Sequence, residues 1–275
     1  MNPIPFSKMN GSGNDFIIID NRQGLVGQDV ADRLARQVCR RKLSVGADGL
    51  ILIEAADDAD FRWRFYNSDG SRAEMCGNGA RCAARFAWMN GIAGMTMTFE
   101  TDAGRISAEM LGERVKVGLT DPTGFLPELD LHLSFGKITL ASVNTGVPHA
   151  VIETDELESV DVETLGREIR NHPRFQPAGT NVNFCRRTGD RRISVRTYER
   201  GVESETLACG TGATAAALVT AVRHGMGESV EAVTRSGGVL TVHFQSVQDG
   251  FRSVFLEGDA RLVYTGSLMA DALME

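Results

Sequence analysis

The sequence predicts an α+β fold of two similar halves, in each of which short strands surround a buried helix. Three observations carry this prediction. Runs of β-branched and aromatic residues dominate the chain, one helical segment is small and apolar on every side, and a cysteine motif recurs in the second half. The 275 residues suffice for two domains that each bury a core of their own.

The expected strands are short runs whose residue types suit a pleated, buried surface. In chain order they cover residues 16–20, 50–53, 61–66, 95–99, 115–117, 137–143, 182–186, 193–198, 239–244 and 261–264. A further β-like run begins at Pro148, directly after Gly146-Val147.

Two expected helices are amphipathic. Residues 29–41 place Val30, Leu34 and Val38 on one face, and Asp29 is the expected N-cap. Residues 162–171 form the other, which Pro173 should stop, because proline cannot continue a helix.

Two more helices begin directly after a cysteine. Residues 79–89 end at Asn90-Gly91, and residues 212–224 end at Gly225, which is the usual residue type just past a helix. The segment from Ala213 to Val219 is small and apolar all round, so it should be buried with sheet wrapped around it.

The two halves are related by a constant offset of 133 residues (209 − 76). It aligns Cys76-Gly77-Asn78-Gly79-Ala80 with Cys209-Gly210-Thr211-Gly212-Ala213, and it also aligns Gly13 with Gly146 and residues 45–48 with residues 178–181. We expect an N-terminal domain over residues 1–121 that carries Cys76 and a C-terminal domain over residues 122–264 that carries Cys209.

A cysteine at a helix start has a particular chemistry. The free N–H groups and partial positive charge of a helix N-terminus favour the thiolate and bind anions, and glycine lets the backbone approach closely. Two such ends could hold a carboxylate with a sulfur on either side of its α-carbon. One thiolate could then remove the α-proton while the other thiol protonates the opposite face. The three remaining cysteines are expected to be small buried residues, namely Cys39, Cys82 and Cys185.

Several function classes fit poorly. The net charge of −7 argues against a nucleic-acid partner, and no apolar run is long enough to span a membrane. Without a signal-peptide pattern, five thiols in a reducing cytoplasm are expected. Gly11-Ser12-Gly13-Asn14 precedes a strand, which excludes a dinucleotide turn, and Cys76 with Cys82 gives too few ligands for a zinc site, so no metal is expected.

An ordered set of motifs resembles the diaminopimelate epimerase family over essentially the whole chain. These motifs are Gly11-Ser12-Gly13-Asn14-Asp15-Phe16, Tyr66-Asn67-Ser68-Asp69-Gly70-Ser71, Cys76-Gly77-Asn78-Gly79-Ala80-Arg81-Cys82, Gly179-Thr180-Asn181-Val182-Asn183-Phe184, Tyr198-Glu199-Arg200-Gly201 and Glu205-Thr206-Leu207-Ala208-Cys209-Gly210-Thr211-Gly212.

The resemblance implies interconversion of LL- and meso-diaminopimelate in lysine and peptidoglycan synthesis, without pyridoxal phosphate or metal. It implies two pseudo-symmetric domains, each a curled mixed or antiparallel sheet wrapped around a central helix, with the site in the cleft between them. The last residues, 265–275, would return to the first domain. A homodimer is the default expectation for such an enzyme.

The resemblance also implies roles for individual residues. Cys76 and Cys209 would be the base and acid pair, and Cys76 would take the proton from the LL isomer. The reacting carboxylate would meet backbone N–H groups of Gly77, Asn78, Gly210 and Thr211. The amino groups and the remaining carboxylate would be bound by Asn14, Asn67, Asn181, Glu199 and Arg200. His149 and Glu199 would support the cysteines electrostatically.

Two positions depart from the family pattern, because Gly49 stands where glutamine is frequent and Val147 stands where asparagine is frequent. They leave open a two-cysteine epimerase of another amino acid, such as a hydroxyproline-like compound. A third hypothesis is a thiol redox or anion-binding protein in which Cys76 and Cys209 form a functional disulfide.

Overall fold

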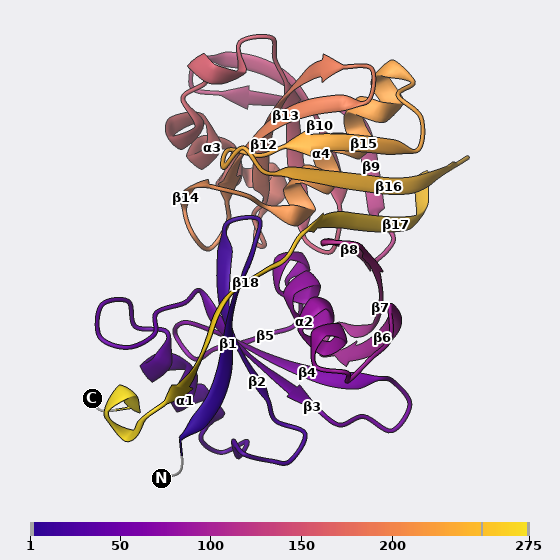
Figure 1. Cartoon of the computed structure of the whole chain (residues 1–275). Helices are drawn as coiled ribbons and strands as arrows, with labels where there is room; N and C mark the ends of the chain where they lie inside the picture. Colours follow the sequence, from indigo (N-terminus) through magenta and orange to yellow (C-terminus); the bar gives the residue numbers. More distant parts are fainter. Residues whose placement is uncertain (1–2, 249, 274–275) are drawn as a thin grey trace. The chain divides into compact units, whose positions relative to one another are not determined.

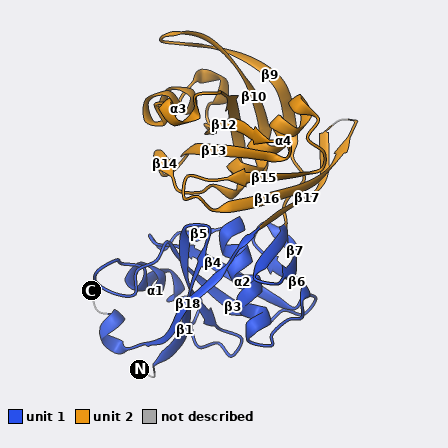
Figure 2. Ribbon diagram, turned by 45° about the horizontal axis from the view of Figure 1, so that its top comes forward, with its two compact units in different colours: residues 1–117, 258–275 blue, residues 118–257 orange. Residues whose placement is uncertain are grey.

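The computed structural model describes residues 3–248 and 250–273 and divides the chain into two compact units (Figure 2). Unit 1 consists of residues 1–117 and 258–275, and unit 2 of residues 118–257. The junctions at 117/118 and 257/258 lie a few residues from those expected at 121/122 and 264/265. The α+β fold class is confirmed, with strands in the majority. No described helix is long and apolar enough to cross a membrane.

The strands of unit 1 form a mixed, mostly antiparallel sheet (Figure 1). The order begins β18–β1–β2, antiparallel throughout, and continues with β3 parallel to β2 and β4 antiparallel to β3. Strand β4 also pairs with β5 and, in parallel, with β6, which leads through β7 to β8. The strands are β1 (Ile4–Gly11), β2 (Asn14–Asp20), β3 (Gly49–Glu54), β4 (Phe61–Asn67), β5 (Arg72–Ala73), β6 (Thr96–Thr101), β7 (Gly104–Leu111), β8 (Arg114–Gly118) and β18 (Arg261–Leu268).

Unit 2 repeats this topology strand for strand. Its order is β9–β10–β11 antiparallel, β12 parallel to β11, β13 antiparallel to β12, β14 and the parallel β15 beside β13, then β16 and β17 antiparallel. The strands are β9 (Thr123–Leu133), β10 (Gly136–Asn144), β11 (Pro148–Glu153), β12 (Asn181–Gly189), β13 (Arg192–Glu199), β14 (Ser204–Thr206), β15 (Ser229–Val233), β16 (Val239–Val247) and β17 (Gly250–Asp259). The returning strand β18 therefore holds in unit 1 the place that β9 holds in unit 2.

Each unit has one helix inside the curve of its sheet. Helix α2 (Gly77–Met89) lies within unit 1 (Figure 1), and α4 (Gly210–His224) lies within unit 2. Every residue of α4 from Gly212 to Ala221 is buried, as its uniformly small and apolar sequence predicts. Gly225 ends the helix in a left-handed conformation with φ +61°, so its role as a C-cap is confirmed.

A second helix covers the other face of each sheet, namely α1 (Ala31–Val38) in unit 1 and α3 (Val162–Arg170) in unit 2. Ile17 and Ile19 of β2 pack with Leu34 and Val38 of α1. Both faces of the central strands are thus covered, which explains the uninterrupted apolar run of β2. Short 3-10 turns complete the units at Leu157–Ser159, Pro173–Phe175 and Ala270–Leu273.

The prediction for α1 was wrong at both ends. The helix begins at Ala31 after Val30, without a side-chain cap, so Asp29 is not its N-cap. It ends at Val38 rather than at Arg41, because the chain turns back there and the Gly46 N–H donates to the Val38 carbonyl at 2.9 Å.

Candidate active site

The two recurring cysteines are the N-caps of the two central helices. Cys76 has an extended backbone (φ −147°, ψ 116°), and Cys209 has nearly the same one (φ −121°, ψ 112°). The carbonyl of Cys76 accepts the first helical hydrogen bond from Ala80 at 2.8 Å, and that of Cys209 accepts one from Ala213 at 2.9 Å. Both helices begin two residues earlier than expected, so each sulfur lies at the positive end of a helix.

The Cys209 sulfur is also held by its own helix. It accepts a hydrogen bond from the Gly212 N–H at 3.4 Å and lies 3.5 Å from the Thr211 hydroxyl. The Thr211 carbonyl in turn accepts a hydrogen bond from the Thr145 hydroxyl at 3.0 Å. These contacts orient the first turn of α4, where Gly210 and Thr211 present the N–H groups that no helical carbonyl can use.

The other three cysteines have a different environment. They are Cys39, Cys82 and Cys185. Burial raises the pKa of each of these thiols to about 12, so each remains protonated at neutral pH. A protonated, enclosed thiol is a poor nucleophile and a poor base.

In unit 1, two expected substrate-binding residues are joined to each other. The Asn78 amide donates to Asn14 Oδ1 at 2.7 Å, and the Asn14 amide donates to Asp48 Oδ2 at 2.9 Å. The Asn78 side chain is buried, so its backbone N–H, at the start of α2, is the group left for a ligand. Asn67 lies at the end of β4, opposite Gly49, where its amide donates to Ser71 Oγ at 3.0 Å.

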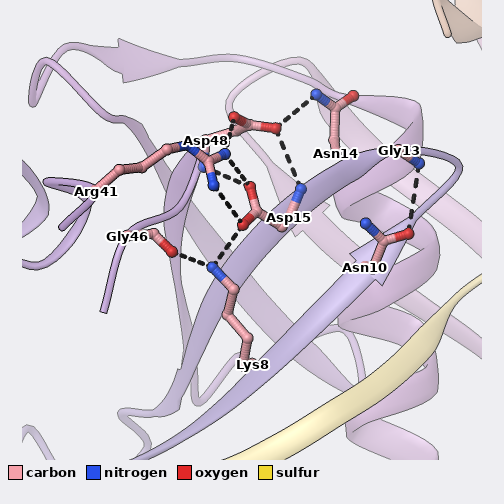
Figure 3. Close-up of polar contacts among 8 residues, drawn as sticks. All are labelled: Lys8, Asn10, Gly13, Asn14, Asp15, Arg41, Gly46 and Asp48. Atoms are coloured by element: carbon pink, nitrogen blue, oxygen red, sulfur yellow. Dashed lines mark hydrogen bonds and ion pairs between the residues drawn. The ribbon is translucent and has the colours of Figure 1, made fainter. Parts of the chain in front are cut away.

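A network of charged side chains surrounds Asp48, the carboxylate that accepts from Asn14 (Figure 3). Asp15 forms ion pairs with Lys8 and Arg41, both at 2.7 Å, and Arg41 also contacts Asp48 at 2.9 Å. Burial alone would raise the pKa of Asp15, but hydrogen bonds from Arg41 and Lys8 hold it below its usual value. Sequence reasoning gave no role to Lys8 or Arg41. Arg41 lies 26 positions from Asp15 in the chain, so no local pattern links these two residues.

Arg81, in the first turns of α2, is a fully buried cation of this unit, with 0% exposure. Its guanidinium donates to Ser12 Oγ at 2.8 Å, to Asn78 Oδ1 at 2.7 Å and to the Asp259 carbonyl at 3.2 Å. The Ser12 hydroxyl in turn donates to the Asp259 carboxylate at 2.8 Å. Burial lowers the pKa of Arg81, whereas the neighbouring Cys82 and Cys76 would raise it as thiolates. Arg81 belongs to the Cys76 motif, and an arginine among alanines in a helix expected to be interior could have indicated a buried charge.

Close packing explains why a glycine stands at position 49 in this chain. It begins β3 opposite Asn67, and a β-carbon there would lie 2.4 Å from the Phe65 ring and 2.7 Å from the Tyr66 carbonyl oxygen. A larger residue at this position would require Phe65 to move.

In unit 2, three expected residues meet at the ends of neighbouring strands β12 and β13. Asn181 Oδ1 accepts a hydrogen bond from the Arg200 backbone N–H at 2.7 Å, and the Arg200 side chain donates to the Ala178 carbonyl at 2.9 Å. Glu199 precedes Arg200 at the end of β13, and burial raises the pKa of its carboxyl. The three side chains provide an acid, a cation and an amide, which suit an amino-acid head group.

His149 lies opposite Asn181 in the parallel pair β11–β12 and is fully buried. Its Nδ1 lies 3.0 Å from the Asn183 amide nitrogen, and its Nε2 is buried without a hydrogen-bond partner among the described residues. Burial lowers the pKa of His149 to about 3, with Arg200 acting in the same direction. The imidazole is therefore neutral at physiological pH and offers hydrogen bonds rather than a charge. Across the described ranges, no three His, Cys, Asp or Glu side chains gather closely enough to hold a metal ion.

Comparison with known proteins gives a consistent result. A sequence model described as diaminopimelate epimerase matches residues 6–123 and 141–263. The diaminopimelate epimerase of Aquifex aeolicus is 48% identical over 281 residues, covering 98% of this chain and 99% of that one. That of Hydrogenobaculum is 46% identical over 275 residues, with 95% and 97% covered. Among solved structures, a PhzF-family phenazine biosynthesis protein of Bacillus anthracis has a TM-score of 0.73 at 16% identity, with 98% of this chain and 100% of that chain covered.

Proposed function

The chain belongs to the diaminopimelate epimerase family, and we propose that it interconverts LL- and meso-diaminopimelate by direct proton transfer between Cys76, Cys209 and the substrate. It is an isomerase that acts on a small amino acid in lysine biosynthesis. The observation that carries the mechanism is the pair of cysteines, each at the N-terminus of the buried central helix of its unit.

The proton balance follows from two sulfurs of opposite protonation. The Cys76 thiolate takes the α-proton of the LL isomer and becomes a thiol, while the Cys209 thiol protonates the opposite face and becomes a thiolate. The reverse reaction exchanges the roles. The two helix N-termini suit this cycle because each favours the thiolate form of its cysteine.

The weak acidity of the α-proton is the main barrier. The N–H groups of Gly77 and Asn78, with those of Gly210 and Thr211, would bind the reacting carboxylate and stabilise the charge that develops on it. One such donor contributes roughly 3 kcal/mol in other enzymes. No pyridoxal phosphate or metal is needed in this scheme.

The amino groups and the distal carboxylate would be bound by the polar residues of both units. In unit 2, Arg200 would pair with a carboxylate, and Glu199 and Asn181 would accept from an ammonium group. In unit 1, Asn14 and Asn67 would add amide contacts. His149, as a neutral group, and Glu199, which adds negative potential when ionised, would support the cysteines.

Cellular context completes the proposal. The enzyme would work in the cytoplasm, without nucleic acid or a membrane, and as a symmetric homodimer. Light scattering of the purified protein would give its mass, and a monomer at working concentration would remove the dimer from the proposal.

The test is incubation with LL-diaminopimelate in D₂O, followed by proton NMR and chiral analysis. We expect meso product with deuterium at one α-carbon, and loss of the product in Cys76→Ala and Cys209→Ala. Proline and hydroxyproline serve as substrates with a single amino-acid head, and should not exchange. Turnover of these but not of diaminopimelate would favour an epimerase of another amino acid. A reversible disulfide with no α-proton exchange on any substrate would favour the redox hypothesis.

A further inference from the structure

Asn183, in β12, is the centre of a buried hydrogen-bond chain under the first turn of α4. Its amide nitrogen donates to the Ala150 carbonyl at 3.1 Å and lies 3.0 Å from His149 Nδ1. Its amide oxygen accepts from the Thr197 hydroxyl at 3.0 Å. Asn183 and His149 have 0% exposure and Thr197 has 3%, so water does not compete for these bonds.

The orientation of the Asn183 amide is fixed by chemistry. A backbone carbonyl can only accept, so the Asn183 atom that faces Ala150 must be the nitrogen. The same nitrogen faces His149 Nδ1, and Nδ1 must therefore accept as well. A neutral imidazole that accepts at Nδ1 carries its proton on Nε2.

The Nε2–H donor so defined is buried and has no partner among the described residues. Arg200 is the charged group whose field reaches the ring, and it opposes a positive charge on His149. The His149 Nε2–H donor and the Arg200 cation thus both act on the region around the imidazole ring. The acceptor that fits them is an anion, either a substrate carboxylate or a thiolate.

Unit 1 lacks this chain, although its topology is the same. The internal repeat places Phe16 where unit 2 has His149 (149 − 133). Gly79, the counterpart of Gly212, faces the side chains of Phe16, Ile51 and Trp63, whereas Gly212 faces Asn183 and Thr197. The fold is therefore compatible with an apolar core here, and the polar chain is a property of the unit that carries Cys209.

We propose that Asn183 and Thr197 are positioning residues that hold His149 as the neutral Nε2–H tautomer. In this form His149 serves the Cys209 half of the site as a hydrogen-bond donor to an anion, and never as an imidazolium or a proton-accepting base. The link to epimerisation rests on the proposed function, whereas the tautomer does not.

The tautomer can be read directly by long-range ¹H–¹⁵N NMR on the uniformly labelled full chain. The chain has five histidines, and His149→Gln assigns the signal by its loss. We expect His149 to show an unprotonated Nδ1 and a protonated Nε2, without titration between about pH 5 and pH 8. A protonated Nδ1, or titration in that range, would overturn the proposal.

Two variants test what sets the tautomer. Asn183→Asp offers Nδ1 an acceptor and should move the proton to Nδ1. Thr197→Val should leave the amide less ordered and yield a mixture of tautomers, while Thr220→Val, an equally buried threonine that contacts the Ala216 carbonyl and Cys185, should change nothing. An unchanged tautomer in Asn183→Asp, with the fold retained by circular dichroism, would show that Asn183 does not set it.

The acceptor is identified by two further spectra. A shift of the Nε2–H signal on adding diaminopimelate to Cys209→Ala indicates a carboxylate, and a shift caused by that substitution without ligand indicates the thiolate. Absence of both shifts would overturn the donor role. In turnover assays, Asn183→Asp should lower kcat about 10- to 100-fold, the range for one hydrogen bond to a charged acceptor. The ligand-free tautomer remains readable even if the protein does not act on diaminopimelate.

Discussion

The sharpest prediction compares Gly→Ala substitutions at equivalent positions of the two cysteine motifs. At Gly212, a β-carbon would lie 2.3 Å from Asn183 Oδ1 and 3.1 Å from Thr197 Oγ1, so Asn183 would have to move. Loss of its three hydrogen bonds costs about 3 kcal/mol at roughly 1 kcal/mol each. Alanine returns up to about 1 kcal/mol through helix propensity. The net loss of stability in Gly212→Ala is therefore about 2 kcal/mol.

Gly79→Ala is the matched control. Its β-carbon would lie 3.3 Å from Ile51 Cδ1 and from Trp63 Cζ3, and 3.5 Å from the Phe16 ring. These are side-chain ends that need to yield by only a few tenths of an ångström. We expect the strain and the propensity gain to cancel, leaving stability within about 1 kcal/mol of wild type.

Urea unfolding measures both variants. Far-ultraviolet circular dichroism reports the whole chain, whereas both tryptophans, Trp63 and Trp88, lie in unit 1, so their fluorescence reports that unit. Gly212→Ala should lower the free energy of unfolding measured by circular dichroism more than Gly79→Ala does. Equal losses in the two variants, or a loss under about 0.5 kcal/mol in Gly212→Ala, would refute the packing argument.

Alkylation of the native protein near pH 8 should modify Cys76 and Cys209 first. The other three thiols should react only after urea is added, because burial keeps them protonated: Cys39, Cys82 and Cys185. Mass spectrometry that finds two early labels supports this prediction, and early labelling of any of the three buried thiols contradicts it. Arg81→Met should lower the free energy of unfolding in urea by more than about 2 kcal/mol, since two buried acceptors and one part-buried acceptor lose their donor. Arg62→Met, which removes an exposed partner of Glu100, should lower it by less than about 1 kcal/mol. Similar losses in the two variants would show that the Arg81 contacts add little. Burial raises the pKa of the Glu199 carboxyl, so its contribution to stability is complete below the unfolded pKa near 4.5 and is lost as pH rises through the folded pKa. Glu199→Gln should therefore have a higher melting temperature than wild type at pH 7 but not at pH 4. A gain that is the same at both pH values would exclude the burial of the charged carboxylate as its cause.

Much of the candidate site could be predicted because its signals are local. A cysteine before Gly-x-Gly-Ala marks a helix start, and both cysteines lie at helix N-termini in the structure. A helix that is small and apolar on all sides can only be an interior helix, as α4 is.

Some strands were missed although local signals exist. In β7, buried and exposed residues alternate from Ile106 to Met110, as expected for a strand with one covered face. β1 was also not predicted: it pairs locally with β2, and its other edge pairs with β18, which joins residues more than 250 positions apart, such as Ile4 with Leu268.

The sequence by itself determined the two-unit plan, since a repeat at one offset carries equivalent strands, turns and helix starts into both halves. It also determined which cysteines lie at helix ends, because caps depend on near neighbours. Only the tertiary structure decided which polar groups meet. Arg81 contacts Asp259 from 178 positions away, Arg41 pairs with Asp15 from 26 positions away, and the Asn183 amide meets His149 from 34 positions away. Such contacts leave no periodic trace in a sequence, because they depend on where distant strands close together and which buried groups must then satisfy one another.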